Sequence, residues 1–160
     1  MFDSIAITQA TARDVPPSLE ILLDSYLGEE YFTREVAGPI LREAAEKEEL
    51  FVAKAEDGEI LGFYRINMRG TFSVFPYLAL IAVRKDVRGE GLGTRLLRHV
   101  EERIVGERDC LFCTKIFLLL GKNNTRAQGF YAKNGYVRVG TIPSLFEPGV
   151  DEYLMMKNLK

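Results

Sequence analysis

The stretch from Tyr77 to Val105 constrains the fold more than any other part of this 160-residue chain. It opens with a continuous apolar run, Tyr77 to Val83, which is short for a core helix and predicts a strand covered on both faces. Glycines then occupy alternate positions in the segment from Arg88 to Gly93. From Thr94 onward apolar residues recur at helical spacing. The stretch therefore predicts a buried strand, a tight turn and an amphipathic helix.

The glycine-rich turn favours an anionic ligand. Glycine adopts backbone conformations closed to other residues and leaves its N–H group uncovered, while the following helix offers unpaired N–H groups and the positive end of its dipole. These are the elements of a phosphate site. The spacing is neither that of a Walker A loop nor Gly-x-Gly-x-x-Gly, the dinucleotide pattern. Alternatively, the glycines serve only a tight strand-to-helix turn.

Two segments carry a family resemblance. Arg88-Gly89-Glu90-Gly91-Leu92-Gly93 resembles the Arg/Gln-x-x-Gly-x-Gly/Ala signature of the GNAT superfamily, the acyl-CoA-dependent N-acyltransferases. Asn124-x-x-Ala127-x-x-Phe130-Tyr131-x-x-x-Gly135-Tyr136 is similar to a second segment of that family. Two matches at a suitable separation are more specific than either alone.

The expected element order is strand, two helices, three strands, helix, strand, helix and two strands, which is also the order of that family. The resemblance covers Ile5 to Leu159. It implies an α/β (α+β) fold, with a mixed, mostly antiparallel seven-stranded sheet splayed between its fourth and fifth strands and helices on both faces. We expect a single domain, residues 1–160. The expected helices are Leu19–Leu27, Gly38–Glu49, Thr94–Val105 and Thr125–Asn134, and the expected loops are Glu29–Phe32, Arg69–Pro76 and Ile142–Val150.

The resemblance implies an N-acetyltransferase that moves an acetyl group from acetyl-CoA to a primary amine by direct attack in a ternary complex. In the family the glycine turn binds the CoA pyrophosphate, and the preceding strand pairs with the pantetheine arm. Tyr131 matches the general acid for the departing sulfur; its alternative role is a packed core tyrosine. The residues that the resemblance assigns to coenzyme binding are Ile81, Ala82, Val83, Arg88, Gly89, Glu90, Gly91, Leu92, Gly93, Thr94, Asn124 and Tyr131. Arg88 alternatively is a solvated arginine, and Asn124 caps the helix that follows it.

The general base is where the sequence departs from the family. Some members carry a glutamate on the fifth strand, at the position of Leu119. The strand from Tyr77 to Val83 has no carboxylate or histidine either. The open alternatives are a water relay, Tyr77, or a residue of the segment from Tyr26 to Glu35. Its three glutamates are candidates only by position, and solvated surface is the alternative for each: Glu29, Glu30 and Glu35.

The other chemically active residues predict no site. His99 falls on the polar helix face and is expected at the surface. Cys110 and Cys113 form an isolated Cys-x-x-Cys without the further ligands that zinc needs, so we expect two reduced thiols and no metal.

Charge and composition limit the partners and the compartment. The net charge of −2 gives no global case for binding nucleic acid or an anionic membrane. The N-terminus lacks the pattern of a signal peptide and no apolar run has the length of a membrane span, so we expect a cytoplasmic protein. A homodimer is left open.

The acceptor is not specified by the sequence. Aromatic residues and carboxylates in the variable segments, such as Glu147, suggest a cationic amine with apolar parts, either a small molecule or a peptide. Two other classes of protein remain as alternatives: a non-catalytic CoA-binding or regulatory module on the same fold, and a nucleotide-binding domain.

Overall fold

The computed structural model describes residues 4–160, so Met1–Asp3, which entered the localisation argument, lie outside the described residues. The strands are β1 (Ala6–Gln9), β2 (Leu50–Lys54), β3 (Ile60–Thr71), β4 (Phe75–Val83), β5 (Lys115–Gly121), β6 (Val137–Glu147) and β7 (Val150–Asn158). The helices are α1 (Val15–Leu23), α2 (Tyr26–Tyr31), α3 (Arg34–Glu46), α4 (Leu92–Gly106) and α5 (Thr125–Lys133), with 3₁₀ turns η1 (Ala12–Asp14) and η2 (Lys85–Val87).

The strands form one seven-stranded sheet in the order β1-β2-β3-β4-β5-β7-β6. The pairs β1–β2, β2–β3, β5–β7 and β6–β7 are antiparallel. The pair β4–β5 is parallel, with Tyr77 opposite Phe117. The expected mixed, mostly antiparallel sheet is therefore confirmed.

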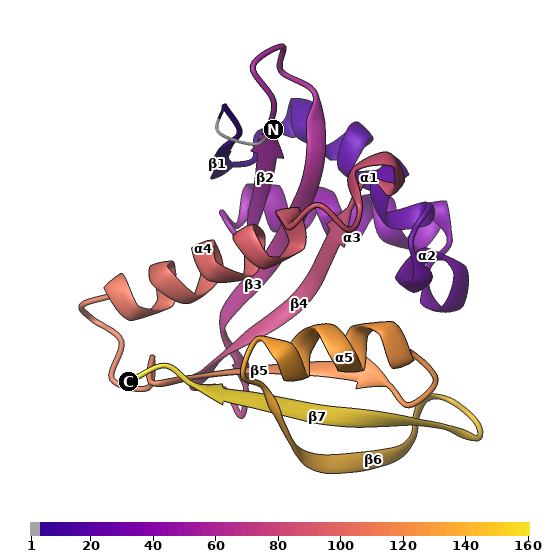
Figure 1. Ribbon diagram of the computed structural model, residues 1–160, viewed down its shortest axis with the longest axis vertical. Coiled ribbons are helices and arrows are strands. Elements are labelled where there is room, and N and C mark those ends of the chain that lie inside the picture. Colours follow the sequence, from indigo (N-terminus) through magenta and orange to yellow (C-terminus); the bar gives the residue numbers. More distant parts are fainter. Residues whose placement is uncertain (1–3) are drawn as a thin grey trace. The chain divides into compact units, whose positions relative to one another are not determined.

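The chain forms two compact units, and β3, β4 and α4 each contribute to both. The first unit comprises residues up to Ile66 together with Leu80–Val100. In Figure 1, α4 crosses in front of β2 and β3 while α3 passes behind them, so helices cover both faces of these strands. The core of this unit is built from side chains that are fully or almost fully buried: Leu22, Leu41, Leu50, Val52, Phe63, Leu96 and Val100.

The second unit comprises Asn67–Ala79 and Glu101–Lys160. Its β5, β7 and β6 form an antiparallel sheet, and Figure 1 shows α5 running along β5. Ile116, Leu118, Leu120 and Met155 are buried in its core. Five of the seven residues of β5 are buried.

The N-terminal helices begin earlier than predicted. The first helix is α1, which starts at Val15 and carries the two prolines in its first turn, where a missing N–H group is not needed. The predicted loop at 29–32 lies mostly within α2, because Ser25 caps a new helix, and the single helix predicted at 19–27 is divided between α1 and α2. Likewise α3 starts at Arg34 and includes Pro39, instead of starting at that proline.

Two predicted loops are β-hairpins. Residues 69–71 end β3 and residues 75–76 begin β4, so only residues 72–74 form the turn, in which Phe72 and Ser73 adopt positive φ angles of 52° and 63°. Residues 142–150 are mostly strand, since β6 continues to Glu147. β6 tolerates Pro143 because it is an edge strand whose register is irregular between residues 142 and 147.

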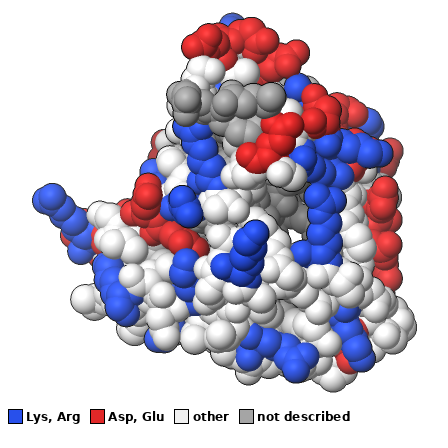
Figure 2. Space-filling view, viewed as in Figure 1, with Lys and Arg blue, Asp and Glu red and all other residues white. Residues whose placement is uncertain are grey.

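No helix within residues 4–160 has the length and hydropathy needed to cross a bilayer. Figure 2 shows several separate groups of Asp and Glu side chains on the visible face, interspersed with separate groups of Lys and Arg. The visible face therefore has no broad basic field, in keeping with the net charge of −2.

Candidate functional site

The glycine turn lies in the first unit, between η2 and α4. Gly89 and Gly91 have φ angles of 81° and 91°, a region that side-chain-bearing residues rarely adopt. A Cβ atom placed on either would meet nothing within 4 Å. The glycines are therefore required by backbone conformation, and the space beside them is open to a ligand.

The start of α4 supplies main-chain donors next to this open space. The helix begins at Leu92, two residues earlier than predicted, and the Leu92 side chain is 1% exposed and anchors it in the core. The Arg95 N–H donates to the Gly91 carbonyl. The N–H groups of residues 92–94 come before this bond, at the helix start, where N–H groups have no acceptor within the helix itself. Such a helix terminus attracts anions.

The Arg88 side chain holds the turn to its surroundings. Its Nε donates to the Val83 carbonyl at 2.9 Å, and a terminal nitrogen donates to the Asp24 carbonyl at 2.9 Å. These bonds join the end of β4, the turn and the segment after α1. In this structure Arg88 is therefore a bracing residue and not the solvated arginine that was the alternative.

Strand β4 has one half-open face. Its burial alternates strictly: Leu78, Leu80 and Ala82 are buried, whereas Ile81 and Val83 are half-buried. The prediction of a strand covered on both faces therefore holds for one face only, and the other face is half-buried. An apolar strand that leaves alternate positions partly open offers a surface for a slender ligand.

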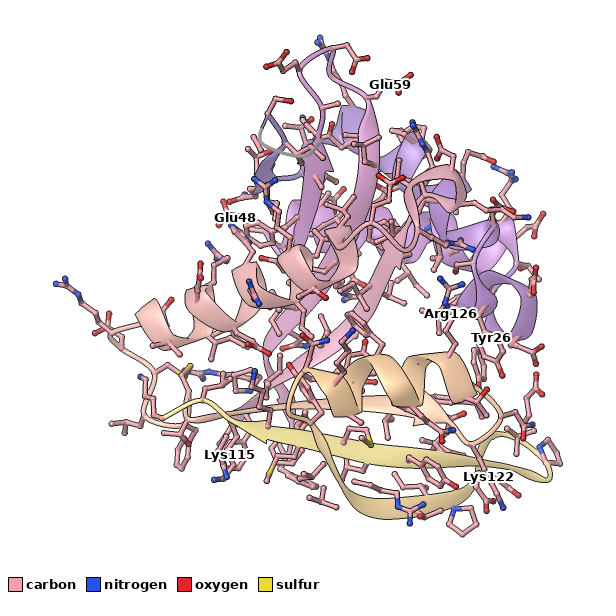
Figure 3. All side chains as sticks on the ribbon, viewed as in Figure 1. Tyr26, Glu48, Glu59, Lys115, Lys122 and Arg126 are labelled. Atoms are coloured by element: carbon pink, nitrogen blue, oxygen red, sulfur yellow. A yellow bond between two sulfur atoms is a disulfide. The ribbon has the colours of Figure 1, made fainter. Side chains whose placement is uncertain are left out.

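Asn124 and Tyr131 belong to the second unit. The Asn124 side chain accepts a hydrogen bond from the Ala127 N–H at 3.2 Å, so the predicted helix cap is confirmed. Cationic residues occur on both sides of this cap in the sequence, and Figure 3 shows Arg126 on α5 and Lys122 after β5.

Tyr131 is a buried phenol on α5. It is 7% exposed, and its ring contacts those of Phe130 and Tyr136, with centroids 5.1 and 5.4 Å apart. Burial, and to a lesser degree the neighbouring Tyr77, raises its pKa above the ordinary value. Tyr131 therefore keeps its proton at neutral pH and suits the role of donor.

The residues considered as the base have environments that disfavour the role. Burial and the charge of Glu152 raise the pKa of Tyr77, so its phenolate is rarely formed. Glu29, Glu30 and Glu35 are exposed. Hydrogen bonds from its own backbone and from Thr33 lower the pKa of Glu35, which makes it a weaker base.

Glu152 on β7 is the residue that sequence reasoning missed. It is 2% exposed, and among the described residues of the second unit it is the one buried acidic or basic side chain. The signal was present, because Glu152 shares a strand face with Leu154 and Met156 at alternate positions.

The predictions for His99 and the cysteines were wrong. His99 is half-buried, with its Nδ1 2.8 Å from the Tyr64 hydroxyl, and the Phe51 ring lies beside both. Cys110 and Cys113 form a disulfide, because their Cα atoms lie only 5.4 Å apart in the turn before β5. Within residues 4–160, no group of three or more His, Cys, Asp or Glu side chains could hold a metal ion.

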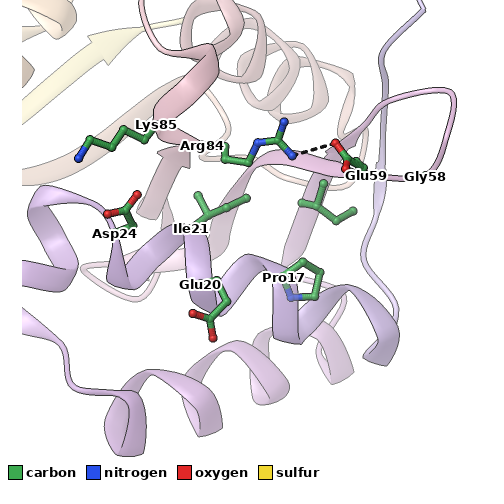
Figure 4. Close-up of a pocket in the computed structure, with 9 residues that line it drawn as sticks. Pro17, Glu20, Ile21, Asp24, Gly58, Glu59, Arg84 and Lys85 are labelled. Carbon is green, nitrogen blue, oxygen red and sulfur yellow. Dashed lines mark hydrogen bonds and ion pairs between the residues drawn. The ribbon is translucent and has the colours of Figure 1, made fainter.

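A surface groove in the first unit lies outside the predicted site. Its volume is about 590 Å³, and Glu20, Asp24 and Lys85 are among its lining residues (Figure 4). Arg84, also in its wall, is bound by Glu59 at 3.0 Å and by Asp86 at 2.7 Å. None of the residues assigned to coenzyme binding lines it.

Comparisons with known proteins agree with the geometry. A family model described as an acetyltransferase (GNAT) domain matches residues 46–138. An uncharacterised N-acetyltransferase of Methanocaldococcus jannaschii is 31% identical over 101 residues, which make up 63% of this chain and 61% of that protein. The blasticidin-S acetyltransferase of Streptomyces morookaense is 31% identical over 83 residues, 52% of this chain and 57% of that protein. The chain thus spans about six-tenths of the length of these relatives.

The fold also recurs among solved structures. An aminoglycoside 6′-N-acetyltransferase complexed with coenzyme A superposes with a TM-score of 0.74 at 17% identity, over 97% of each chain. At this identity the match shows a shared fold.

Proposed function

Since the chain belongs to the GNAT family of acetyltransferases, we propose that it moves the acetyl group of acetyl-CoA to a primary amine by direct attack within a ternary complex. The observation that carries this proposal is the open glycine turn. Its two positive-φ glycines have free space beside them, and the donors at the start of α4 follow at once. This arrangement fits a diphosphate better than it fits a purely structural turn.

Each part of the site has a role in the proposed reaction. Main-chain amides from Gly89 to Thr94 hold the pyrophosphate, and the main chain of Ile81 and Val83 binds the pantetheine arm alongside the half-open face of β4. Acetyl-CoA supplies the thioester, whose carbonyl is polarised by main-chain donors. Tyr131 donates a proton to the departing sulfur.

We also propose that both units act together as one domain, residues 1–160, because the residues with proposed roles are divided between them. We keep three further predictions: the protein is cytoplasmic, it has no nucleic-acid or membrane partner, and it can form a homodimer.

The acceptor is proposed to be a cationic primary amine. Similar proteins are named for blasticidin S and for an aminoglycoside, so small polar amines are the first to test.

Calorimetry with acetyl-CoA and with CoA tests the proposal directly, followed by release of free thiol in the presence of amines. The variant Gly91→Ala forces a side-chain-bearing residue to a φ of 91° and should weaken CoA binding. Gly106→Ala, at the other end of α4 and also with open space beside it, is the matched control. Absence of CoA binding by the wild-type protein refutes the proposal, whereas binding without turnover favours the non-catalytic module.

A further inference from the structure

We propose that Arg88 is a positioning residue that makes the junction of α1 and α2 follow the state of the glycine turn. When coenzyme fixes the turn, the Arg88 side chain transmits this order to the short helix α2. The inference rests on the proposed function and deepens it, because it assigns a regulation of the same site. All the residues that carry it belong to the first unit.

The first hydrogen bond of Arg88 fixes the end of β4. The Arg84 N–H donates to the Leu61 carbonyl at 2.8 Å, which directs the main chain of residue 84 toward β3. Because adjacent residues of a strand direct their main-chain groups to opposite sides, the N–H and the carbonyl of Val83 point away from β3. On that side the Arg88 Nε donates to the Val83 carbonyl at 2.9 Å. The guanidinium therefore lies beside the main-chain groups that are proposed to bind the pantetheine arm.

The second hydrogen bond of Arg88 ends at the C-terminus of α1. Asp24 follows the last residue of this helix, and its N–H donates to the Glu20 carbonyl at 3.1 Å. The carbonyls at a helix C-terminus lack donors within the helix and carry a partial negative charge, so they favour a cation. A terminal nitrogen of Arg88 donates to the Asp24 carbonyl at 2.9 Å, across 64 positions of sequence. A charge-assisted hydrogen bond thus joins the end of α1 to the residue that precedes the glycine turn.

Helix α2 starts directly at this junction. Ser25 caps it, because the Gly28 N–H donates to the Ser25 Oγ at 3.4 Å and the Glu29 N–H donates to the Ser25 carbonyl at 3.0 Å. The helix has six residues, and no side chain in it is buried. Helices of this length are unstable by themselves, so the placement of the first turn decides whether α2 stays formed. The bond to Asp24 therefore acts on a segment whose order is easily changed.

The glycine turn has freedom that a ligand can remove. Gly89 follows Arg88 directly, and a Cβ atom placed on Gly89 or Gly91 would meet nothing within 4 Å. A glycine backbone in open space keeps much of its conformational freedom. A diphosphate bound by the N–H groups of the turn removes this freedom and fixes the backbone from which the Arg88 side chain extends. Coupling of this kind needs only a loss of motion on binding, without a change of shape.

The coupling bears on the reaction through the residues of α2. This helix carries Glu29 and Glu30, two of the alternatives that the sequence left open for the base, and both are exposed. An acceptor that contacts α2 would bind more tightly once coenzyme has ordered it. By reciprocity, such an acceptor would strengthen coenzyme binding by the same factor.

Amide hydrogen exchange with CoA as the probe tests the coupling without a known acceptor. Two peptides are compared with and without saturating CoA: residues 24–33, which contain α2, and residues 86–96, which contain the glycine turn. The proteins are the wild type, Arg88→Gln, Arg88→Lys and a control. Calorimetry on each protein sets the CoA concentration that saturates it.

The matched control is Arg84→Gln. It removes a half-buried guanidinium that lies four residues earlier in the same segment, and whose partners are the carboxylates of Glu59 and Asp86. In this variant the bonds of Arg88 to Val83 and Asp24 stay in place, so the coupling should persist.

In the wild type and in Arg84→Gln we expect CoA to slow exchange about threefold or more in both peptides. In Arg88→Gln the peptide of the glycine turn should keep its protection, whereas the effect of CoA on residues 24–33 should disappear. Arg88→Lys should show a reduced effect, because an ammonium group lacks the fork of donors that reaches both carbonyls. A purely structural brace would instead raise exchange in residues 24–33 equally with and without CoA.

Three results overturn the inference and leave the proposed function standing. CoA could protect the glycine turn of the wild type without protecting residues 24–33, it could protect these residues equally in the wild type and the Arg88 variants, or the variants could show the CoA-independent rise of a structural brace. If circular dichroism shows that Arg88→Gln is unfolded, the same comparison with Arg88→Lys decides. Wild-type protein in which CoA protects neither peptide and gives no heat refutes the proposed function itself.

Discussion

Tyr131→Phe removes one oxygen atom and isolates the proton-donating role. The phenylalanine ring keeps the contacts with Phe130 and Tyr136, so the fold should persist. Because the pKa of the phenol is raised above its ordinary value of about 10, less than roughly one part in a thousand is ionised at neutral pH. The wild type therefore always has this proton available, and the variant never does.

The expected loss follows from the usual contribution of a general acid, about 10²- to 10⁴-fold in kcat, or roughly 3 to 5 kcal/mol of barrier. CoA affinity should change by less than about threefold, which corresponds to under 1 kcal/mol, because the proposed role of the hydroxyl is proton donation and not CoA binding. Single-turnover rates and calorimetry measure the two quantities separately.

Tyr136→Phe is the matched control for this change. It removes the same atom from a neighbouring tyrosine, whose hydroxyl donates to Glu101 at 2.9 Å and has no proposed part in the reaction. We expect it to lower stability and leave kcat unchanged. Unchanged turnover in Tyr131→Phe, or an equal loss in both variants, would refute the proton-donor role.

Three further predictions concern stability. Glu101→Gln should cost about 1 to 3 kcal/mol in urea unfolding, because the Lys157 ammonium loses a partner at 2.9 Å that is only 13% exposed; an unchanged midpoint would contradict this. Asp14→Asn should cost about 1 to 3 kcal/mol at neutral pH. Burial raises the pKa of Asp14, but hydrogen bonds from Thr11 and the charge of Lys54 outweigh it, so the folded pKa is below the unfolded one. Its stabilisation is thus present above the unfolded pKa and disappears as pH falls through the folded pKa, and a cost that persists in strong acid would show another cause. Cys110→Ser should cost about 2 kcal/mol or less, since the disulfide closes a loop with a sequence separation of only 3; equal stability of the wild type with and without reductant would argue against the bond.

The sequence predicted best those features whose cause is local. The positive φ angles of Gly89 and Gly91 and the Asn124 cap each depend on a few adjacent residues. The mixed, mostly antiparallel seven-stranded sheet followed from the family resemblance and was confirmed. Local signals failed where tertiary packing overrides them. Pro39 lies inside α3, although a proline inside a helix is unfavourable by itself.

Failures in the candidate site have a different origin, namely contacts that no linear pattern specifies. The His99 ring meets Tyr64 across 35 positions of sequence, so its polar-face position on the helix gave the wrong environment. The register irregularity that keeps Pro143 in β6 depends on pairing with β7.

The two halves of the proposed chemistry differ in how the chain encodes them. The proposed coenzyme binding depends mainly on main-chain donors, which the glycine turn and the start of α4 present together. The site can therefore be predicted from one short segment of the sequence. The proposed proton transfer instead depends on one side chain, that of Tyr131 on α5, whose burial is set by packing against Phe130 and Tyr136. Coenzyme binding and proton transfer should therefore be separable by mutation: Tyr131→Phe should lower turnover while CoA still binds, and Gly91→Ala should weaken CoA binding while the surroundings of Tyr131 stay intact.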